Sequence, residues 1–299
     1  MHWQLHIASQ PFRSIFILPG KPAQLAVSET RQKIRFYDLV SGVHYLDMEL
    51  DLKLLDHDSP EERREALNQL KAPNGMFLPV VEFQDRRVHT TMDGSLRLIQ
   101  GAGLILEIDD QTLPLDISPE PTVVAVDLDR DLGTIAALTD DHVLYVYQQQ
   151  TRINTILLED DLPVRVFIKA GGNEIVLVYP EKICLLDMKG RIVCQRDLHY
   201  TIGPVVLSPA GNWLAVADAD YQLIRLYNQE LVPVRQQHAV DLITTARQLQ
   251  LFTNIPAPAA PISALDITDS GVLAFGMAGV LCVAQVEMLT ELPQTRPLL

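Results

Sequence analysis

Short apolar runs separated by turn-forming residues recur along almost the whole chain. Residues 202–235 are the clearest example, because they contain four such runs, at 204–207, 213–217, 223–227 and 231–235. Pro, Gly, Asn and Asp occupy the positions between the runs, which is typical of β-strands joined by tight turns. A sheet of four such strands cannot bury both of its faces by itself. The pattern therefore predicts a repeated sheet that packs against neighbouring copies.

The repeats follow a nearly regular spacing. If the third strand of each repeat is the anchor, the related segments begin at Ile34, Leu96, Leu144, Ile183, Ile224 and Leu281. Subtraction gives intervals of 62, 48, 39, 41 and 57 residues. A period near 40 with longer insertions is typical of a β-propeller. We expect an all-β fold, a single propeller over residues 1–299 with six blades of four antiparallel strands. Seven blades are the alternative, if residues 236–261 contain a degenerate blade.

Two segments of this pattern resemble the WD40-like propeller family. Residues 34–42 (IRFYDLVSG) are similar to the end of that family's third strand, with Tyr37 and Asp38 where Trp and Asp usually stand. Residues 206–215 (VLSPAGNWLA) are similar to its first turn. No repeat contains the Trp-Asp or Gly-His pair of the family. The resemblance implies the geometry of the blades, and such patterns specify a fold rather than a chemistry.

The N-terminus is expected to close the ring. Trp3, Leu5 and Ile7 alternate with polar residues, so residues 3–8 are predicted to form a strand without a hairpin partner nearby. The last repeat shows three clear strands, and the N-terminal strand would be its fourth, outer strand. Closure of this kind removes two exposed sheet edges. A frayed N-terminus is the alternative.

Two insertions have the pattern of short helices. The first covers about 58–72, where Ser59 is the N-cap, Pro60 takes the first helical position and Glu62 completes a capping box. The second covers about 239–253 and has apolar residues at helical spacing. The apolar stripes are expected either to pack on the propeller or to dock a partner, because insertions on one face often form a binding face.

Composition limits the classes of protein and of ligand. The chain is 47% hydrophobic and 21% charged, which supplies a core and argues against disorder. Its formal net charge of −14 argues against nucleic-acid binding, because such binding depends on Lys and Arg that neutralise phosphates. The sequence has neither an apolar run long enough for a transmembrane helix nor the pattern of a signal peptide. Three cysteines fit a reducing compartment, so a cytoplasmic protein is expected.

No motif for catalysis, cofactor binding or zinc binding stands out. The histidines and cysteines lack zinc-ligand spacing, and the chain has no nucleophile elbow or phosphate-binding loop. We therefore expect no cofactor and no catalytic residue. Carboxylates in many turns leave one alternative open, a cation-dependent hydrolase or lactonase whose carboxylates converge on the propeller axis. Solvated turn carboxylates are the simpler interpretation.

Two cysteines lie close together in the sequence. Cys184 and Cys194 stand five residues on each side of Lys189, in a predicted turn between two strands. They are expected to be two reduced, buried thiols. A redox-sensitive pair across the two strands is the alternative.

The expected function is that of a non-catalytic platform, a scaffold subunit that binds one or more proteins in a multiprotein assembly. A rigid disc presents many loops for recognition without a deep catalytic cleft. We expect no nucleic acid, membrane insertion or small-molecule substrate. The candidate partner-binding residues lie on the two predicted helices and on turns of a face predicted to be acidic. They are Glu61, Arg63, Arg64, Leu67, Leu70, Leu249, Leu251, Phe252, Asp140, Asp141, Asp160 and Asp161.

Overall fold

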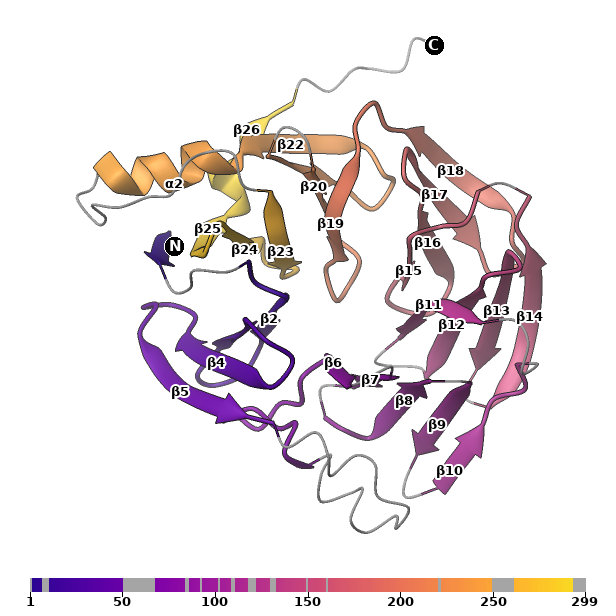
Figure 1. Cartoon of the computed structure of the whole chain (residues 1–299). Coiled ribbons are helices and arrows are strands. Elements are labelled where there is room, and N and C mark those ends of the chain that lie inside the picture. Colours follow the sequence, from indigo (N-terminus) through magenta and orange to yellow (C-terminus); the bar gives the residue numbers. More distant parts are fainter. Residues whose placement is uncertain are drawn as a thin grey trace.

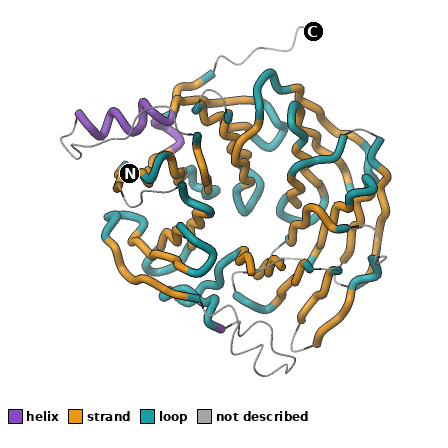
Figure 2. Tube along the Cα trace, in the orientation of Figure 1, coloured by secondary structure: helices purple, strands orange, loops and turns teal. Residues whose placement is uncertain are grey.

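Six antiparallel sheets form a ring around a central axis in the computed structural model (Figure 1). It describes residues 2–6, 11–50, 68–83, 86–91, 93–101, 103–108, 111–117, 122–129, 133–148, 150–159, 161–219, 222–248 and 261–292. Strands dominate the regular structure of this part, and a helix lies at the outside of the ring (Figure 2). The predicted all-β propeller with six blades is confirmed. The alternative of seven blades required a further blade within residues 236–261, and residues 239–248 of this segment form a helix.

The blades follow one another in chain order. Blades 1 to 3 contain β2 (Ser14–Leu18), β3 (Gln24–Ser28), β4 (Lys33–Asp38) and β5 (His44–Glu49), then β6 (Val80–Phe83), β7 (Arg86–Thr90), β8 (Leu96–Gln100), β9 (Leu104–Ile108) and β10 (Gln111–Pro114), then β11 (Val123–Leu128), β12 (Thr134–Thr139), β13 (Val143–Gln148) and β14 (Thr151–Leu157). Blades 4 to 6 contain β15 (Arg165–Ile168), β16 (Glu174–Val178), β17 (Lys182–Asp187) and β18 (Ile192–Asp197), then β19 (Ile202–Leu207), β20 (Leu214–Asp218), β21 (Leu223–Tyr227) and β22 (Pro233–His238), then β23 (Ile262–Ile267), β24 (Val272–Met277) and β25 (Val280–Gln285). Helix α2 (Ala239–Gln248) follows β22, and η2 (Val286–Met288) and β26 (Thr290–Glu291) follow β25.

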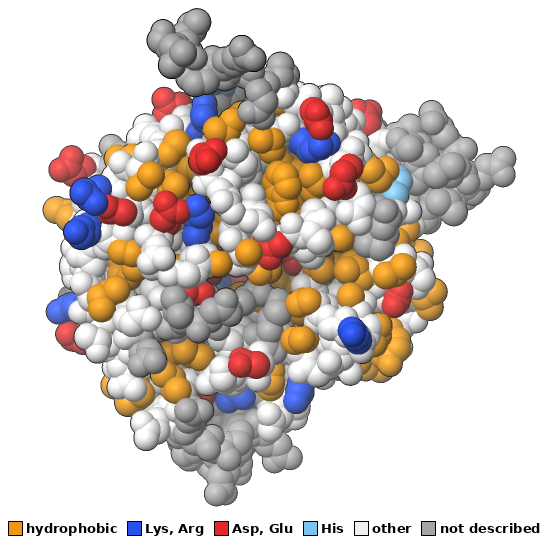
Figure 3. Space-filling model, turned by 180° about the vertical axis from the view of Figure 1, so that it is seen from behind, with side chains coloured by type: hydrophobic (Ala, Val, Ile, Leu, Met, Phe, Trp, Pro, Cys, Tyr) orange, Lys and Arg blue, Asp and Glu red, His pale blue; other side chains and the backbone are white. Residues whose placement is uncertain are grey.

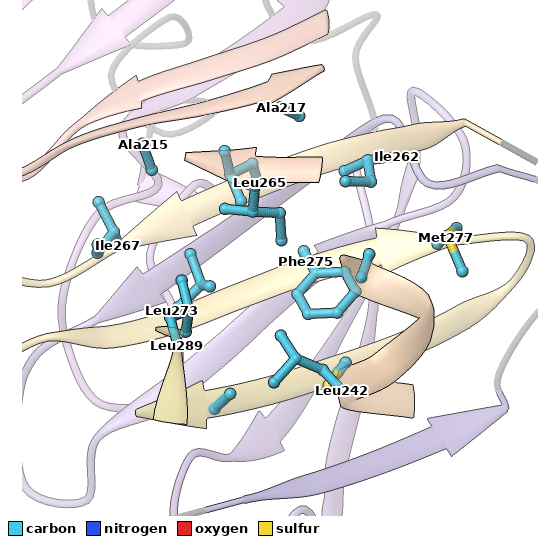
Figure 4. Packing of buried hydrophobic residues seen from close by; sticks show 14 of the residues in the cluster. Ala215, Ala217, Leu242, Ile262, Leu265, Ile267, Leu273, Phe275, Met277 and Leu289 are labelled. Atoms are coloured by element: carbon cyan, nitrogen blue, oxygen red, sulfur yellow. The ribbon is translucent and has the colours of Figure 1, made fainter. Parts of the chain in front are cut away.

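Burial decreases from the second strand to the outer strand of a blade. Second strands such as β12 are buried at every position, because both of their faces pack against a neighbouring blade. Outer strands such as β5 and β18 are mostly exposed. Between blades 5 and 6, Leu242 of α2 points toward the ring of Phe275 (Figure 4). The core is thus a ring of interfaces between blades, which is why a single repeat cannot bury its own faces.

The N-terminal strand completes the last blade. β1 (Trp3–His6) pairs antiparallel with β25, with Trp3 opposite Val283. The indole Nε1 of Trp3 donates a hydrogen bond to the carbonyl of Leu39 at 2.8 Å, in the turn between β4 and β5 of blade 1. The strand predicted over 3–8 therefore begins as expected, and residues 7 and 8 lie outside the described part. This pairing joins the two ends of the ring.

Carboxylates on the strands nearest the axis also join neighbouring blades. Asp127 of β11 accepts a hydrogen bond from the backbone N–H of Ile168 in β15 at 2.7 Å. Asp266 of β23 accepts one from the N–H of Ile17 in β2 at 2.6 Å. Both aspartates are the last but one residue of their strands. These axial carboxylates hold the first strand of the next blade in place.

Blade 2 departs from the predicted repeat because it has an additional strand at the axis. In the turn over residues 91–96, the N–H of Thr91 donates to the carbonyl of Leu96, and the N–H of Leu96 donates to the hydroxyl of Thr91. The turn over 208–213, between the first two strands of blade 5, has the same pattern. β7 is therefore the equivalent of a first strand, and β6 lies on its axial side. The predicted third strand at Leu96 is a second strand, and the equivalent third strand begins at Leu104, 40 residues before Leu144.

Blade 5 is also larger than predicted. β26, near the end of the described chain, pairs antiparallel with the outer strand β22 through Arg235 and Gln236. Arg235 Nη1 donates to the carbonyl of Leu289 at 3.0 Å, which attaches this segment to the blade. The expectation of four strands in every blade is therefore corrected to four or five.

The described part of the second predicted helix packs on the propeller. α2 covers residues 239–248 of the predicted 239–253, and Leu242 and Ile243 are buried between blades 5 and 6. Of the first predicted helix, at 58–72, only residues 68–72 belong to the described part. No helix in the described ranges is long and apolar enough to cross a membrane.

Gly276 in β24 is required by close packing. A Cβ at this position would overlap the ring of Phe12, which is buried in the interface between blades 6 and 1. We expect Gly276→Ala to lower the free energy of unfolding by about 2 kcal/mol, because overpacking of a core costs about 1–3 kcal/mol. Gly103→Ala is the matched control, since no atom lies within 4 Å of its added Cβ. Equal stability of the two variants in urea denaturation would contradict this prediction.

Candidate functional site

The predicted turn aspartates in the described part of the chain are exposed. Asp140 and Asp141 lie between β12 and β13, and Asp161 lies between β14 and β15. Asp140 accepts a hydrogen bond from the N–H of Thr122 at 3.0 Å, and Asp141 accepts one from the hydroxyl of Thr139 at 2.6 Å. The bond of Asp141 lies within its own turn, whereas the bond of Asp140 links the turn to the residue before β11.

The other candidate residues from the sequence fall outside the described part or into the core. Those outside it are Glu61, Arg63, Arg64, Leu67, Asp160, Leu249, Leu251 and Phe252. Leu70 is 2% exposed and packs with Phe36 and Leu78 between blades 1 and 2. Its assignment to a contact surface is corrected, because this apolar side chain fills an interface between blades.

Figure 3 shows the face that is turned away from the viewer in Figure 1. Hydrophobic side chains reach the surface at several places on this face, with acidic and basic side chains scattered among them. Charges of both signs therefore occur on it.

Exposed apolar side chains gather on the outer strand of blade 1 and on the turn before it. Val40, Val43, Tyr45 and Leu46 are 70, 63, 60 and 42% exposed. We call these four residues the β5 surface. The outer strands β14 and β18 each carry two further exposed apolar side chains. The exposed apolar area of the described residues thus lies mainly at the rim of the disc.

The turn that presents the β5 surface is held rigidly. An oxygen of Asp38 accepts hydrogen bonds from the N–H groups of Val40 at 3.2 Å and Ser41 at 2.7 Å. The hydroxyl of Ser41 also donates to it, and these bonds hold the pKa of Asp38 below its usual range. Gly42 has a φ of +72° and lies against Trp3, so that an added Cβ would be 2.9 Å from the indole. The turn is therefore anchored where blade 6 meets blade 1.

Tyr45 lies at a β-bulge of the exposed outer strand β5. In the ladder between β4 and β5, Tyr37 lies opposite His44 and Phe36 lies opposite Leu46. Tyr45 is the extra residue without a partner across the ladder, as in other bulges. The buried partners of its neighbours hold the backbone, while its own ring is free to contact another molecule.

Charged side chains border the β5 surface. Arg35 pairs with Glu29 at 2.9 Å, and Asp47 pairs with Lys33 at 3.3 Å and with His44 at 2.8 Å. β5 is also the end strand of its sheet, so one side of its backbone has no neighbouring strand in the sheet. An apolar strip with a charged border on an edge strand is typical of a surface that binds protein. Sequence reasoning missed it, because a strand pattern alone does not reveal which side a neighbouring blade covers.

The cation-site alternative has no counterpart in the described part of the chain. Among those residues, no group of three or more His, Cys, Asp or Glu side chains is placed to hold a metal ion. Two carboxylates that do lie near the axis, Asp127 and Asp266, accept backbone hydrogen bonds from the next blade. Their observed contacts are those of residues that hold the blades together.

Cys184 and Cys194 lie on opposite faces of blade 4. Cys184 is opposite Gln195, and Cys194 is opposite Leu185. Because successive residues of a strand point to opposite faces, this offset of one residue separates the two thiols. Both are free cysteines. The alternative of a pair across the strands is therefore wrong.

The burial of the thiols predicts a selective reaction. Cys194 is partly exposed, whereas Cys184 and Cys282 are buried, and burial raises the pKa of the Cys282 thiol far above its usual range. Because the thiolate is the reactive form, brief treatment of the native protein with iodoacetamide should modify Cys194 alone. The intact mass should then show one adduct, and three after unfolding in guanidinium chloride. An adduct mapped to Cys184 or Cys282 in the native protein would contradict the expected burial.

Comparison with proteins of known structure places this geometry among known folds. No protein-family model matches the chain, and no curated protein matches it in sequence. Raptor of Chaetomium thermophilum superposes with a TM-score of 0.67 over 97% of this chain, at 10% identity. The β-propeller domain of Cps50 (Swd1) of Myceliophteria thermophila superposes with a TM-score of 0.61 over 93% of this chain, at 9% identity. The chain therefore has the fold of a β-propeller.

This likeness shows the fold and no more, because the identities are so low. The chain spans 29% of the length of the Raptor chain and 96% of the Cps50 propeller chain. The WD40-like resemblance of residues 34–42 and 206–215 is thereby confirmed for the fold. The function of this propeller has to be argued from its own surface.

Proposed function

We propose that the protein is a non-catalytic platform, a scaffold subunit that binds protein partners in a multiprotein assembly. The observation that carries this proposal is the β5 surface, with Val40, Val43 and Tyr45 each at least 60% exposed. Burial of such side chains by a partner is favourable, at roughly 25 cal/mol for each Å² of apolar surface. The surrounding ion pairs would form the polar rim of the contact.

The rigidity of the β5 surface favours tight binding. Asp38 holds the turn, Trp3 supports Gly42, and the ladder with β4 fixes the strand. A surface that is ordered before binding loses little conformational freedom in the complex. The platform therefore needs no rearrangement of blade 1 to receive a partner.

A second contact region is proposed on the two insertions that the sequence predicts to be helical and on turns between strands. It consists of Glu61, Arg63, Arg64, Leu67, Leu249, Leu251, Phe252, Asp140, Asp141, Asp160 and Asp161. The buried face of α2 is used against blades 5 and 6. Contacts from this region would therefore come from other parts of the two insertions and from the carboxylates of the turns.

The experiment compares two sets of outward apolar residues on different blades. The tagged protein is isolated from its native host, and the complex is weighed by native mass spectrometry. We expect a partner in fixed stoichiometry that is lost from the double variant Val43→Ser and Tyr45→Ser. The matched control is Ile192→Ser with Val193→Ser on β18, where the side chains are 59 and 56% exposed. Because a central aromatic contact often contributes about 2 kcal/mol or more, retention of the partner should fall at least tenfold in the first variant alone.

Cross-linking and a fold check complete the experiment. Cross-links from Lys33 should reach the partner, because Lys33 borders the β5 surface. Both variants should retain the circular dichroism of the parent, since the replaced side chains are exposed. Equal loss of the partner in the two double variants would remove the β5 surface from the proposal. Isolation of the chain without any partner in fixed stoichiometry would overturn the platform function itself.

A further inference from the structure

The chain covers the outer edge of blade 5 with a segment of its own. After β25, the segment 286–292 crosses from blade 6 to blade 5, where β26 pairs antiparallel with the outer strand β22 (Figure 1). Glu291 of β26 lies opposite Arg235, and the two side chains form an ion pair at 2.5 Å. The N–H of Leu292 donates a hydrogen bond to the carbonyl of Val234 at 2.9 Å. An outer strand of this propeller therefore accepts an extended segment from outside its own blade.

Apolar contacts accompany the added strand. Val286 and Leu289, which precede β26, are both buried. They belong to the apolar cluster between blades 5 and 6 against which Val234 of β22 packs. The segment is thus held by backbone hydrogen bonds, apolar side chains and one ion pair. These are the contacts by which an extended peptide adds to the edge of a sheet.

The outer strand of blade 1 has the same register as the outer strand of blade 5. In both blades, one residue of the outer strand has no partner across the ladder, next to the residue that faces a tyrosine of the third strand. This bulge residue is Val234 in β22 and Tyr45 in β5. The third strands are also alike in sequence, IRLY at 224–227 and IRFY at 34–37. Tyr45 therefore has the place in blade 1 that Val234 has in blade 5.

The two outer strands differ in what lies beside them. β22 has β26 as a neighbour, whereas β5 is the end strand of its sheet in the described part of the chain. Val234 packs in the apolar cluster, whereas Tyr45 is 60% and Leu46 is 42% exposed. The bulge does not prevent the addition of a strand, because β22 carries the same bulge and still pairs with β26. Among the described residues, β5 thus offers an open edge of the kind that the chain fills on blade 5.

Two other outer strands share the bulge but offer less apolar surface. The bulge residues of β14 and β18 are Ile153 and Val193, which are 48 and 56% exposed. Each of these strands has two exposed apolar side chains, whereas the β5 surface has four, one of them aromatic. Aromatic side chains often dominate the energy of a contact between proteins. Of the three open edges, β5 is therefore the one best suited to bind a segment of a partner.

We propose that the partner of the β5 surface contributes an extended segment that adds antiparallel to β5, as β26 adds to β22. The proposal rests on the platform function, because it names the kind of partner that the β5 surface binds. In the register of β26, one residue of the segment lies opposite Leu46, which takes the place of Arg235, and the preceding residue lies opposite Asp47. The first of these residues should be apolar, and the second should not be acidic, because like charges directly opposite each other are destabilising.

The charges around β5 assign the affinity mainly to backbone and apolar contacts. Asp47 already has Lys33 at 3.3 Å, His44 at 2.8 Å and Arg35 at 3.7 Å, and Arg35 also pairs with Glu29. Positive and negative side chains thus alternate beside the strand and largely neutralise one another. A segment without a carboxylate opposite Leu46 should therefore bind more tightly than one that carries Glu at this position.

The test uses fluorescence anisotropy with labelled synthetic peptides and the full chain. The first peptide has the sequence of residues 286–292 with Glu291→Val, so that an apolar residue faces Leu46. The second is the same peptide with an N-methyl group on the leucine that corresponds to Leu292, whose N–H bonds the bulge residue in blade 5. We expect N-methylation to weaken binding about tenfold, because it removes one backbone hydrogen bond of a strand. The peptide with Glu291 retained should bind several-fold more weakly than the first.

A pair of variants locates the edge. Tyr45→Ser should weaken binding of the first peptide at least tenfold, because it removes the aromatic contact. Val193→Ser is the matched control, since it changes the bulge residue of another outer strand and should leave the affinity unchanged. Both side chains are exposed, so both variants should retain the circular dichroism of the parent.

Other results would overturn the proposal. Equal affinities for the two forms of the first peptide, with and without the N-methyl group, would show that the segment does not add as a strand. Equal affinities of Tyr45→Ser and Val193→Ser would exclude β5 as its edge, and a lack of binding by every peptide would exclude strand addition. If the protein alone forms a dimer that Tyr45→Ser dissociates, a second copy covers β5 instead. Because the peptides are synthetic, these results leave the isolation of a partner, and with it the platform function, to be decided separately.

Discussion

Trp3→Ala should lower the free energy of unfolding by about 3 kcal/mol, at the lower end of the cost for truncating a packed tryptophan. Trp3 is partly buried between β25 and the turn of blade 1, and its indole lies against Gly42. The substitution removes this packing and the hydrogen bond from Nε1 to the Leu39 carbonyl at 2.8 Å. Both contacts hold the outer strand of the last blade against the first blade. Loss of these contacts should weaken the closure of the ring, where the N-terminal strand β1 pairs with β25 of the last blade.

Trp3→Phe is the matched control for this prediction. Phenylalanine keeps an aromatic ring on Gly42 and loses only the hydrogen bond, which should cost about 1 kcal/mol. Urea denaturation followed by circular dichroism measures both variants. If the two variants lose the same stability, the packing of the indole on the turn does not contribute, and the role assigned to the closure is wrong.

His89 should make the protein less stable as the pH falls below neutrality. This histidine of β7 has its pKa lowered to about 4, mainly by burial and further by the charge of Arg87, while a hydrogen bond with Gln100 acts in the opposite direction. Above pH 6.5 the ring is neutral in both the folded and the unfolded chain. Below that pH the unfolded chain takes up a proton that the folded chain excludes until about pH 4. The contribution of His89 to stability is therefore present above pH 6.5 and is lost between pH 6.5 and 4, by about 3 kcal/mol.

The measurement compares the parent and His89→Gln in urea at pH 7, 6, 5 and 4.5. Glutamine cannot take up the proton, so the difference in unfolding free energy between the two proteins should change steadily in favour of the variant as the pH falls. Carboxylates that titrate in the same range affect both proteins equally and cancel in the difference. Parallel stability curves would show that His89 is not held neutral by burial.

The sequence determined the architecture because the signals for strands and turns are local. Alternation at Trp3 and Leu5 predicted a closing strand, and it pairs with β25. The turn predicted between residues 207 and 213 connects the first two strands of blade 5 in the structure. Apolar runs bounded by turn residues need no distant partner to be recognised. The six-fold repeat and the all-β class followed from them.

The count of strands within a blade was less certain from the sequence. Leu96 was assigned to a third strand because it follows a turn and an apolar run, yet the hydrogen bonds of residues 91–96 identify β8 as a second strand. β6 and β7 have similar sequence signals, and only the position of β6 next to the axis makes it an addition to the repeat. The register of paired strands could not be predicted from the sequence either. An offset of one residue between β17 and β18 puts Cys184 and Cys194 on opposite faces.

The sites depended on contacts between residues that are distant in sequence. Leu70 belongs to the core because blade 2 packs on blade 1, while Tyr45 is exposed because it lies on an outer strand that no neighbouring strand covers. Arg13 and Glu82 come together only because blades 1 and 2 lie side by side. Local patterns of apolar and turn residues thus determined the blades, their number and the closing strand. Burial, register and the meeting of charges were decided by the tertiary structure, because each depends on which blade lies beside a given side chain.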